Sequence, residues 1–353
     1  MLLNCIAFGL VLKASNSQKL YVRNSLFATV VDDNQAPNEA SLNGLLAASS
    51  VEDNPNLNAG TIFTAAQQNK LREIVSRSRS LQCQAPGDHS KTSLTATDCL
   101  ARLLAADISP YMIGGQCGLD GSLKSRIGQI IRGQGCCSDY TDAFMMRAKA
   151  TGLKAREVHF LGHTTAKYFD REQGRWKLID TSLRSQISDP DRRLLSAYEL
   201  SRRFPWQALT MVKLPPLDKG VNDNKNFSPY LNVNNSVLYW TRGNNLIEQE
   251  RFELPLAKLG LPKEAIQLAS LTLGVRPGWL VLAPPEAAFR FRLSAILLKS
   301  AISLFVLLNA LLLLAAAWGW RQGRQPKAID LPPKDDQPKQ KMLNQTNRSF
   351  FRS

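Results

Sequence analysis

Cys137, His163 and Asp180 are of the three residue types that together make up a thiol nucleophile system. A cysteine attacks as its thiolate, an imidazole takes up the thiol proton, and a carboxylate orients and stabilises that imidazole. Such a system attacks a carbonyl carbon, forms a thioester and releases an amine. Water then completes hydrolysis, whereas an acceptor amine completes transamidation, and the same three residues serve both outcomes. The sequence therefore predicts a catalytic triad that uses no metal or organic cofactor.

A helix is expected to position the cysteine. Tyr140, Phe144 and Ala148 recur on one helical face, and Gly152 is suited to end the helix in a left-handed conformation. Cys137 then lies at the helix N-terminus, where the positive end of the dipole lowers the pKa of a thiol.

Strands are expected to position the other two side chains. β-like runs cover residues 156–161, 163–170 and 175–179, with a turn through glycine between the last two. His163 opens the second run and Asp180 follows the third. If these two runs are adjacent antiparallel strands, the two side chains come within hydrogen-bond reach.

Four sequence blocks surround these positions in a fixed order. They are Gly135-Cys136-Cys137-Ser138-Asp139-Tyr140, Gly152-Leu153-Lys154-Ala155-Arg156, Gly162-His163 and Trp176-Lys177-Leu178-Ile179-Asp180. This order resembles the transglutaminase-like superfamily, whose pattern is Gly-x-Cys-x-Asp-aromatic, Gly-hydrophobic-x-Ala-Arg, a His that opens a strand, and Trp-x-hydrophobic-hydrophobic-Asp. The resemblance covers about fifty residues. It implies an α+β fold with a papain-like core, in which the Cys-bearing helix packs on an antiparallel sheet.

The resemblance also bears on which of two adjacent cysteines is the nucleophile. Cys137 lies two residues after Gly135 and two before Asp139, as the family pattern requires. Cys136 remains the alternative nucleophile and is otherwise expected to be a structural or modulating thiol.

The sequence departs from the family pattern at two positions in the strand that His163 opens. Thr165 stands where many members have Trp, and Lys167 stands where many have Glu, which leaves substrate preference open and predicts a positive charge near the site. The backbone N–H of Cys137 is an expected oxyanion donor, and Gln134 is a further candidate.

The six cysteines, at positions 5, 83, 99, 117, 136 and 137, include no C-x-x-C pair, so no structural zinc site is expected. Outside the cytoplasm, Cys83, Cys99, Cys117 and Cys136 could form disulfides, and four cysteines allow three full pairings. Buried free thiols are the alternative.

A membrane span is expected near the C-terminus. Residues 301–318 read AISLFVLLNALLLLAAAW without a charge, and Trp318 and Trp320 stand where interfacial aromatics occur. We expect a transmembrane helix over residues 293–320. Three basic residues precede this span within about twenty positions and six follow it, so the positive-inside rule puts the tail, residues 321–353, in the cytoplasm. The larger N-terminal part would then be extracytoplasmic, in the periplasm of a bacterium.

The first residues are ambiguous. Leu2 to Leu12 (LLNCIAFGLVL) is apolar but short, and no basic residue precedes it. It could be a truncated signal-anchor, a weak signal peptide or an apolar element of the fold.

Composition divides the rest of the chain. The expected organisation is a signal, anchor or lead-in over 1–31, a polar loop over 32–60, the transglutaminase-like domain over 61–212, a linker over 213–235 and a small β-rich juxtamembrane domain over 236–292. Helices are expected at 61–82, 95–106 and 122–132. The β-rich assignment rests on the runs VLYW, LIEQERFEL and GWLVLA.

The net charge of +15 is not gathered into a dense basic run with interleaved aromatics. It predicts attraction to anionic surfaces such as lipid headgroups or acidic polysaccharide. Nucleic-acid binding is not expected, because the helix-turn-helix, RNP and zinc-finger patterns are missing from the sequence.

These observations favour a membrane-anchored extracytoplasmic thiol enzyme, a cysteine-dependent amidase, peptidase or acyltransferase. Its expected partners are membrane lipid and a protein or peptide amide substrate at the cell envelope. The resemblance implies hydrolysis more than crosslinking. The alternative is a catalytically silent transglutaminase-like module that binds assembly proteins of an envelope or exopolysaccharide system.

Overall fold

The computed structural model describes residues 26–49, 62–83, 94–108, 122–160, 163–202, 210–213, 237–240, 246–273, 275 and 279–323. The chain divides into two compact units, residues 1–299 and 300–353. The first unit, called the body below, mixes helices and strands. The second contains most of a long apolar helix.

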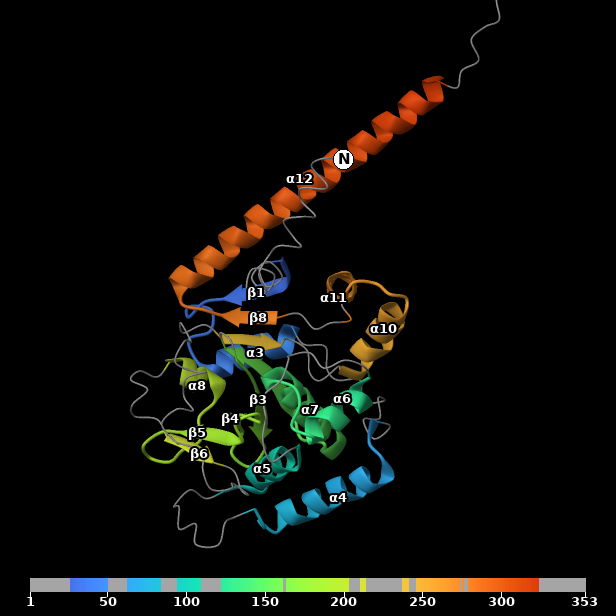
Figure 1. Cartoon of the computed structure of the whole chain (residues 1–353). Coiled ribbons are helices and arrows are strands. Elements are labelled where there is room, and N and C mark those ends of the chain that lie inside the picture. Colours follow the sequence, from blue (N-terminus) through green and yellow to red (C-terminus); the bar gives the residue numbers. More distant parts are fainter. Residues whose placement is uncertain are drawn as a thin grey trace, which may run out of the picture. The chain divides into compact units, whose positions relative to one another are not determined.

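The helices and strands follow one another along the described chain (Figure 1). The helices are α3 (Glu39–Ser49), α4 (Ala65–Arg79), α5 (Ala96–Ile108), α6 (Leu123–Ile131), α7 (Cys137–Thr151), α8 (Ala197–Arg202), α10 (Leu246–Lys258), α11 (Lys263–Thr272) and α12 (Pro285–Gly323). The strands are β1 (Ala28–Val31), β2 (Ala155–Phe160), β3 (His163–Asp170), β4 (Arg175–Ile179), β5 (Ser185–Ser188), β6 (Thr210–Lys213), β7 (Val237–Trp240) and β8 (Trp279–Leu282).

A six-stranded sheet in the order β1-β8-β7-β2-β3-β4 forms the centre of the body. The pairs β8–β7, β7–β2, β2–β3 and β3–β4 are antiparallel, and the edge strand β1 pairs with β8 in parallel. In the β3–β4 pair, Ala166 lies opposite Ile179 and Asp170 lies opposite Arg175. Continued by one pair, this register puts Asp180 opposite Thr165, and the first residue of β3, His163, lies two positions further along on the same face of the sheet.

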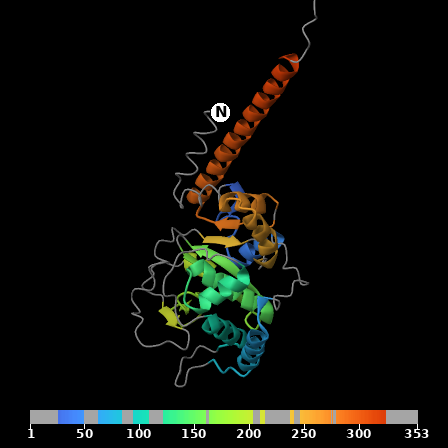
Figure 2. The same ribbon diagram turned by 45° about the vertical axis from the view of Figure 1, so that its right-hand side comes forward.

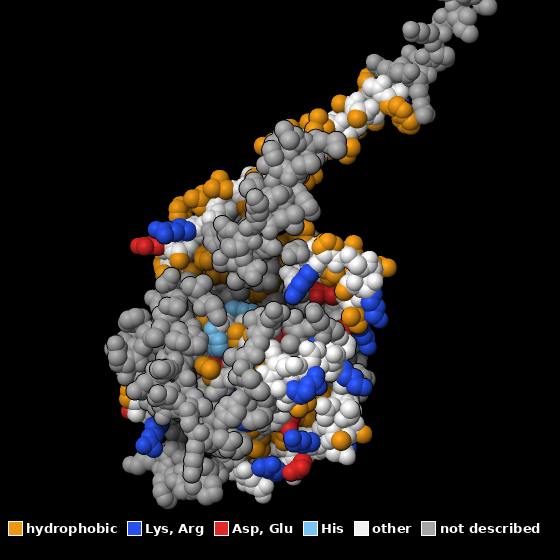
Figure 3. Space-filling view, in the orientation of Figure 1, with side chains coloured by type: hydrophobic (Ala, Val, Ile, Leu, Met, Phe, Trp, Pro, Cys, Tyr) orange, Lys and Arg blue, Asp and Glu red, His pale blue; other side chains and the backbone are white. Residues whose placement is uncertain are grey.

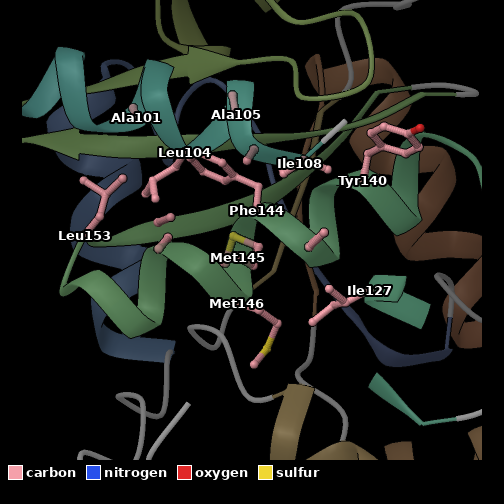
Figure 4. Packing of buried hydrophobic residues seen from close by; sticks show 14 of the residues in the cluster. Ala101, Leu104, Ala105, Ile108, Ile127, Tyr140, Phe144, Met145, Met146 and Leu153 are labelled. Atoms are coloured by element: carbon pink, nitrogen blue, oxygen red, sulfur yellow. The ribbon is translucent and has the colours of Figure 1, made fainter. Parts of the chain in front are cut away.

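Helices cover both faces of this sheet, as Figure 2 shows from a second direction. On one face α4, α5, α6 and α7 share a core with residues of β2, β3 and β4. Figure 4 shows its centre, where Leu104 of α5 lies against Phe144 of α7. On the other face α3, α8 and β5 pack against residues of β1, β2, β4 and β8. The helix that begins at Cys137 is therefore held between the sheet and three other helices.

Most of the elements expected around the triad are confirmed. The expected helices at 61–82, 95–106 and 122–132 correspond to α4, α5 and α6, and the expected strands at 163–170 and 175–179 match β3 and β4. Tyr140, Phe144 and Ala148 are buried as expected. Gly152 follows α7 with a φ of 72°, a left-handed conformation in which glycine lacks the steric cost of a side chain.

The expected β-rich juxtamembrane domain over 236–292 is wrong. Its runs VLYW and WLVL do form β7 and β8, but both strands belong to the same sheet as β2, β3 and β4. The run LIEQERFEL lies in helix α10. Glutamate, glutamine, arginine and leucine are good helix formers, and this preference outweighs the short apolar groups that suggested a strand.

The expected polar loop over 32–60 is also wrong in part, because it contains α3. Asn38 accepts a hydrogen bond from the Ser41 backbone N–H at 2.8 Å, and Leu42 and Leu46, one helical turn apart, are fully buried. Residues 28–31 of the expected lead-in form β1. The apolar segment 2–12, residues 50–60 and most of the expected linker, 214–235, lie outside the described residues.

The helix α12 starts earlier than the expected span at 293–320. Over residues Pro285–Arg321 it is long and apolar enough to cross a membrane. Its first turns belong to the body, where Ala288 is fully buried against Val281 and Ala283.

Cys83 and Cys99 form a disulfide with a Cα–Cα distance of 5.4 Å. Cys136 is also disulfide-bonded. Cys5 and Cys117 lie outside the described residues. The disulfide alternative therefore holds for three of the four cysteines named for it, and Cys137 is the free cysteine among the described residues.

Candidate active site

The antiparallel pair β3–β4 brings His163 and Asp180 together, as the sequence predicts. His163 Nε2 lies 2.6 Å from Asp180 Oδ2. Both residues are buried, with 7% of His163 and 1% of Asp180 exposed. Because Nε2 is occupied by the carboxylate, the other ring nitrogen, Nδ1, is left for Cys137.

The Asp180 carboxylate is fixed by its own turn. Its Oδ1 accepts hydrogen bonds from the Ser182 backbone N–H at 3.0 Å, the Ser182 hydroxyl at 2.8 Å and the Leu183 backbone N–H at 2.9 Å. The Asp-Thr-Ser sequence thus starts a turn. Asp180 Oδ1 accepts the hydrogen bonds of this turn, and Oδ2 faces His163. A carboxylate held this way keeps the imidazole in one orientation.

Cys137 is the first residue of α7. Gly135, two residues earlier, has a φ of 96°, and the Cys136 backbone N–H donates to Asp139 Oδ2 at 3.0 Å. The Arg126 guanidinium of α6 lies 3.7 Å from Asp139 Oδ1 and is also paired with Asp142. The turn that presents the thiol is therefore tied to two helices. The half-buried Cys137 side chain is the most exposed of the three predicted triad residues.

The structure also joins Cys137 to His163. Burial alone raises the pKa of the Cys137 thiol, but a hydrogen bond from His163, the His163 charge and the Thr164 backbone N–H outweigh it and lower the pKa below its usual value. Burial lowers the pKa of His163, and the Asp180 carboxylate and Cys137 more than reverse this, raising that pKa to about 10. The two shifts favour a thiolate–imidazolium pair at neutral pH.

All three predicted site residues are thus brought together, in the order thiol, imidazole, carboxylate. The chain matches no protein-family model and no curated protein sequence. The interpretation of the site therefore depends on the motif blocks and on this geometry.

Cys136 does not act as an alternative nucleophile in this structure, because its sulfur is part of a disulfide. Its Sγ lies 3.3 Å from the Ser138 hydroxyl, which donates to it. Of the two oxyanion candidates, the Cys137 backbone N–H donates no hydrogen bond to a described residue, as expected for the first residue of a helix. The Gln134 backbone N–H donates instead to the Gln129 carbonyl at 3.2 Å.

Thr165 has a role at the site that sequence reasoning did not find. Its hydroxyl donates to the Ile179 carbonyl at 2.6 Å, and Thr165 is fully buried. This bond joins β3 to β4 next to His163 and Asp180. Threonine is common in strands, so its presence in β3 does not by itself indicate this contact. Only its place opposite the end of β4 in the folded sheet does.

Lys167, from which a positive charge near the site is expected, is a buried side chain. Lys167 is 1% exposed, and its Nζ lies 4.7 Å from the centre of the Trp176 ring. Burial and the neighbouring Arg156 charge lower its pKa to about 7, although Glu39 acts in the opposite direction. Four residues along a strand separate Lys167 from His163 by roughly 13 Å.

His159 lies near the site without being part of the triad. Its Nε2 is 2.9 Å from Glu157 Oε1, and its Nδ1 is 3.0 Å from the Thr164 hydroxyl. Figure 3 shows histidine side chains, in pale blue, reaching the surface of the body. The described residues contain no group of three His, Cys, Asp or Glu side chains placed to hold a metal ion.

Proposed function

We propose that this protein is a transglutaminase-like thiol enzyme with a papain-like core, which cleaves or transfers amide bonds of a protein or peptide at the cell envelope. One observation carries the proposal. Cys137 at the start of α7 faces His163, and His163 is held by Asp180 at 2.6 Å on the neighbouring strand. A buried core cysteine has no reason to meet an imidazole that a fixed carboxylate keeps protonated.

The geometry supports a stepwise reaction. The Cys137 sulfur electron pair attacks the amide carbonyl carbon, and the C–S bond forms as the carbonyl π electrons move to oxygen. The Cys137 backbone N–H would stabilise this oxyanion. As the C–N bond breaks, His163 Nδ1 gives its proton to the departing amine, which leaves a thioester on Cys137.

The second half of the reaction restores the enzyme. His163, now neutral, takes a proton from water or from an acceptor amine as that nucleophile attacks the thioester carbonyl. The thiolate leaves, and the pair of Cys137 thiolate and protonated His163 is restored. Asp180 keeps its charge throughout and holds the imidazole in place.

We further propose that α12 anchors the enzyme in a membrane. Its length and apolar composition suit a span, and the larger number of basic residues after the span favours a cytoplasmic tail. The body would then be extracytoplasmic, where disulfides such as Cys83–Cys99 persist.

Alkylation by a fluorescent iodoacetamide near pH 6 tests the enzyme proposal in membranes that contain the full chain. An ordinary thiol is about 0.3% ionised at this pH. A thiolate held by His163 should therefore react up to about 100-fold faster than an ordinary thiol. We expect Cys137→Ala to abolish the fast reaction, and His163→Gln and Asp180→Asn to slow it.

His159→Gln is the matched control, because it removes a histidine close in space that does not hold the thiol. It should react at the wild-type rate. Equally slow reaction of wild type and His163→Gln would contradict the proposal and would favour a catalytically silent binding module.

A further inference from the structure

Outside α12, the described part of the body exposes large apolar side chains almost entirely in one place. Outside α12, five such side chains are exposed among the described residues, and four of them are Leu259, Leu261, Leu268 and Leu273. The fifth is Ile131. Single exposed leucines are common on soluble proteins, but a cluster of this kind marks a contact surface.

The four leucines belong to a helical hairpin made of α10, a turn through Gly260, and α11. One side of the hairpin is fixed to the body: Glu250 accepts a hydrogen bond from the Leu123 backbone N–H at 2.7 Å, and Leu246 packs on the core. In α11, Ile266 and Ser270 are buried.

The opposite side of the hairpin is open to solvent. Leu261, Ala265, Leu268 and Thr272 recur at helical spacing and are all exposed, and Leu259 in the turn is 77% exposed. This outer face therefore exposes the apolar side chains Leu261, Ala265 and Leu268, although the hairpin itself is anchored to the body.

Among the side chains of the hairpin that the structure describes, the fully exposed charged ones are basic. Arg251, Lys258 and Lys263 are exposed, whereas Glu253 is only partly exposed and accepts a hydrogen bond from Gln249 at 3.3 Å. Figure 3 shows this end of the body, where orange apolar side chains lie beside blue basic and red acidic ones over α10 and α11. Leucines flanked by lysine and arginine suit the interface of a bilayer, where apolar groups enter the acyl boundary and basic groups meet anionic headgroups.

Chain geometry brings this end of the body close to a membrane, if α12 crosses one as proposed above. Arg292 is tied to the body through hydrogen bonds to Gln35 at 2.6 Å and Asp32 at 3.1 Å, and the apolar run begins at the next residue, Leu293. A span of about 20 residues that ends at Arg321 starts near Ala301. That leaves a helix of only about 13 Å between Arg292 and the hydrocarbon.

The hairpin lies at the same end of the body as the start of α12. Strand β8 connects them: α11 ends at Thr272 shortly before β8, and α12 begins at Pro285 shortly after it. Figure 1 shows α11 and the start of α12 at the two opposite ends of β8.

We propose that the outer face of the α10–α11 hairpin binds the interface of the bilayer that α12 crosses. Leu259, Leu261 and Leu268 would enter the acyl boundary, while Lys258 and Lys263 contact anionic headgroups. A single helix lets a body swivel, and a second contact fixes which face of the body points away from the membrane. The hairpin would thus set the height and orientation of the Cys137 site relative to the membrane surface.

The test uses the full chain in nanodiscs of phosphatidylcholine with and without phosphatidylglycerol. A photo-cross-linking amino acid replaces Leu259 or Leu268 in separate variants. Gln173, an exposed residue in the β3–β4 turn, is the control for a site away from the membrane. Leu308, within the apolar run of α12, is the control for the span itself.

We expect lipid adducts from positions 259, 268 and 308, and several times fewer from 173. Anionic lipid should increase the adducts at 259 and 268 but not at 308. Adducts at 308 without adducts at 259 and 268 would overturn the hairpin contact and leave the anchor intact. No adducts at 308 would instead overturn the anchor and the hairpin contact with it. Cross-links from 259 to a second copy of the chain would overturn the lipid contact in favour of a dimer interface.

Discussion

The two ends of the β3–β4 hairpin both hold buried charges, yet only one end is arranged for chemistry. At the turn end, Lys177 Nζ lies 2.7 Å from Asp98 Oδ2 and 2.5 Å from Asp170 Oδ2. At the open end, His163 lies between Asp180 and the half-buried Cys137. At each end, a cationic side chain is paired with a carboxylate across the same two strands.

The two clusters differ in how completely their members are hydrogen-bonded and shielded from solvent. Besides Lys177, Asp98 accepts from the Tyr168 hydroxyl at 2.7 Å, and Asp170 accepts from the Thr95 hydroxyl at 3.1 Å. None of the three charged groups is more than 3% exposed. The open end instead leaves one member, the Cys137 thiol, within reach of solvent. Buried charge by itself therefore does not indicate a site, whereas an ion pair with one accessible nucleophilic member does.

Removing the cation of the turn end should have the largest effect on stability. Lys177→Met leaves Asp98 and Asp170 buried without their ammonium, which costs roughly 3–5 kcal/mol when a buried pair is broken. Urea unfolding of the full chain in detergent measures this cost. Lys124→Met, on the exposed side of α6, is the control and should unfold like wild type. A loss for Lys177→Met no larger than for Lys124→Met would show that the cluster contributes no stability.

Removing the disulfide next to this cluster should have the second largest effect on stability. Cys99 follows Asp98 directly, and its bond to Cys83 closes a loop with a sequence separation of 16. A loop of this length constrains the unfolded chain by about 3 kcal/mol. The double variant Cys83→Ser/Cys99→Ser should lose about that much stability in urea while iodoacetamide still reacts rapidly with Cys137. Loss of the fast reaction in the folded variant would mean that the two ends of the hairpin are coupled.

Much of the open end could be predicted from the sequence because its signals are local. Residues Cys137 to Gly152 carry a helical apolar pattern with a glycine stop, and the two runs after His163 alternate around one glycine turn. Their proximity then followed from the register of one hairpin. The role of Thr165 could not be predicted, because it depends on which carbonyl lies opposite in the folded sheet.

The turn end and the rest of the sheet could not be predicted, because their partners are distant in sequence. Asp98 meets Lys177 only after α5 has packed across β3 and β4. The sequence indicates strands at β7 and β8, but their pairing with β2 and β1 depends on residues far away in the chain. The burial of Lys167 is hard to predict for the same reason, since it depends on Trp176 of the adjacent strand, which β3 meets only in the folded sheet.

The charge pair of the open end predicts an unusual pH dependence. At a pH above 6.5 and above the lowered pKa of the folded Cys137 thiol, but below 9.0, the unfolded chain carries one proton on Cys137, and the folded pair carries one on His163. Equal proton numbers give no change of stability with pH. Cys137→Ala removes this balance, because Asp180 still raises the pKa of His163. In this variant, the stability that the charged His163–Asp180 pair contributes is fully present below pH 6.5. It is lost as the pH rises through the folded pKa of His163.

Thermal unfolding at several pH values between 6.5 and 9 measures this effect. Relative to wild type, Cys137→Ala should lose up to about 1.4 kcal/mol per pH unit. The stability of the double variant Cys137→Ala/His163→Gln should change with pH in the same way as that of wild type. If Cys137→Ala also runs parallel to wild type, no proton is held on His163 by Asp180.

The smallest effect is expected from Thr165→Val, which keeps the shape of the side chain and removes its hydrogen bond to the Ile179 carbonyl. The loss of one buried hydrogen bond should cost about 1 kcal/mol in urea unfolding. The neighbouring Thr164→Val is the matched control, because its hydroxyl bonds the partly exposed His159, where water can replace it. A smaller loss for Thr165→Val than for Thr164→Val would show that the bond across the strands does not hold the open end. The expected order would instead mean that a hydroxyl, in a place where the transglutaminase-like pattern has an aromatic ring, helps to keep His163 and Asp180 in register.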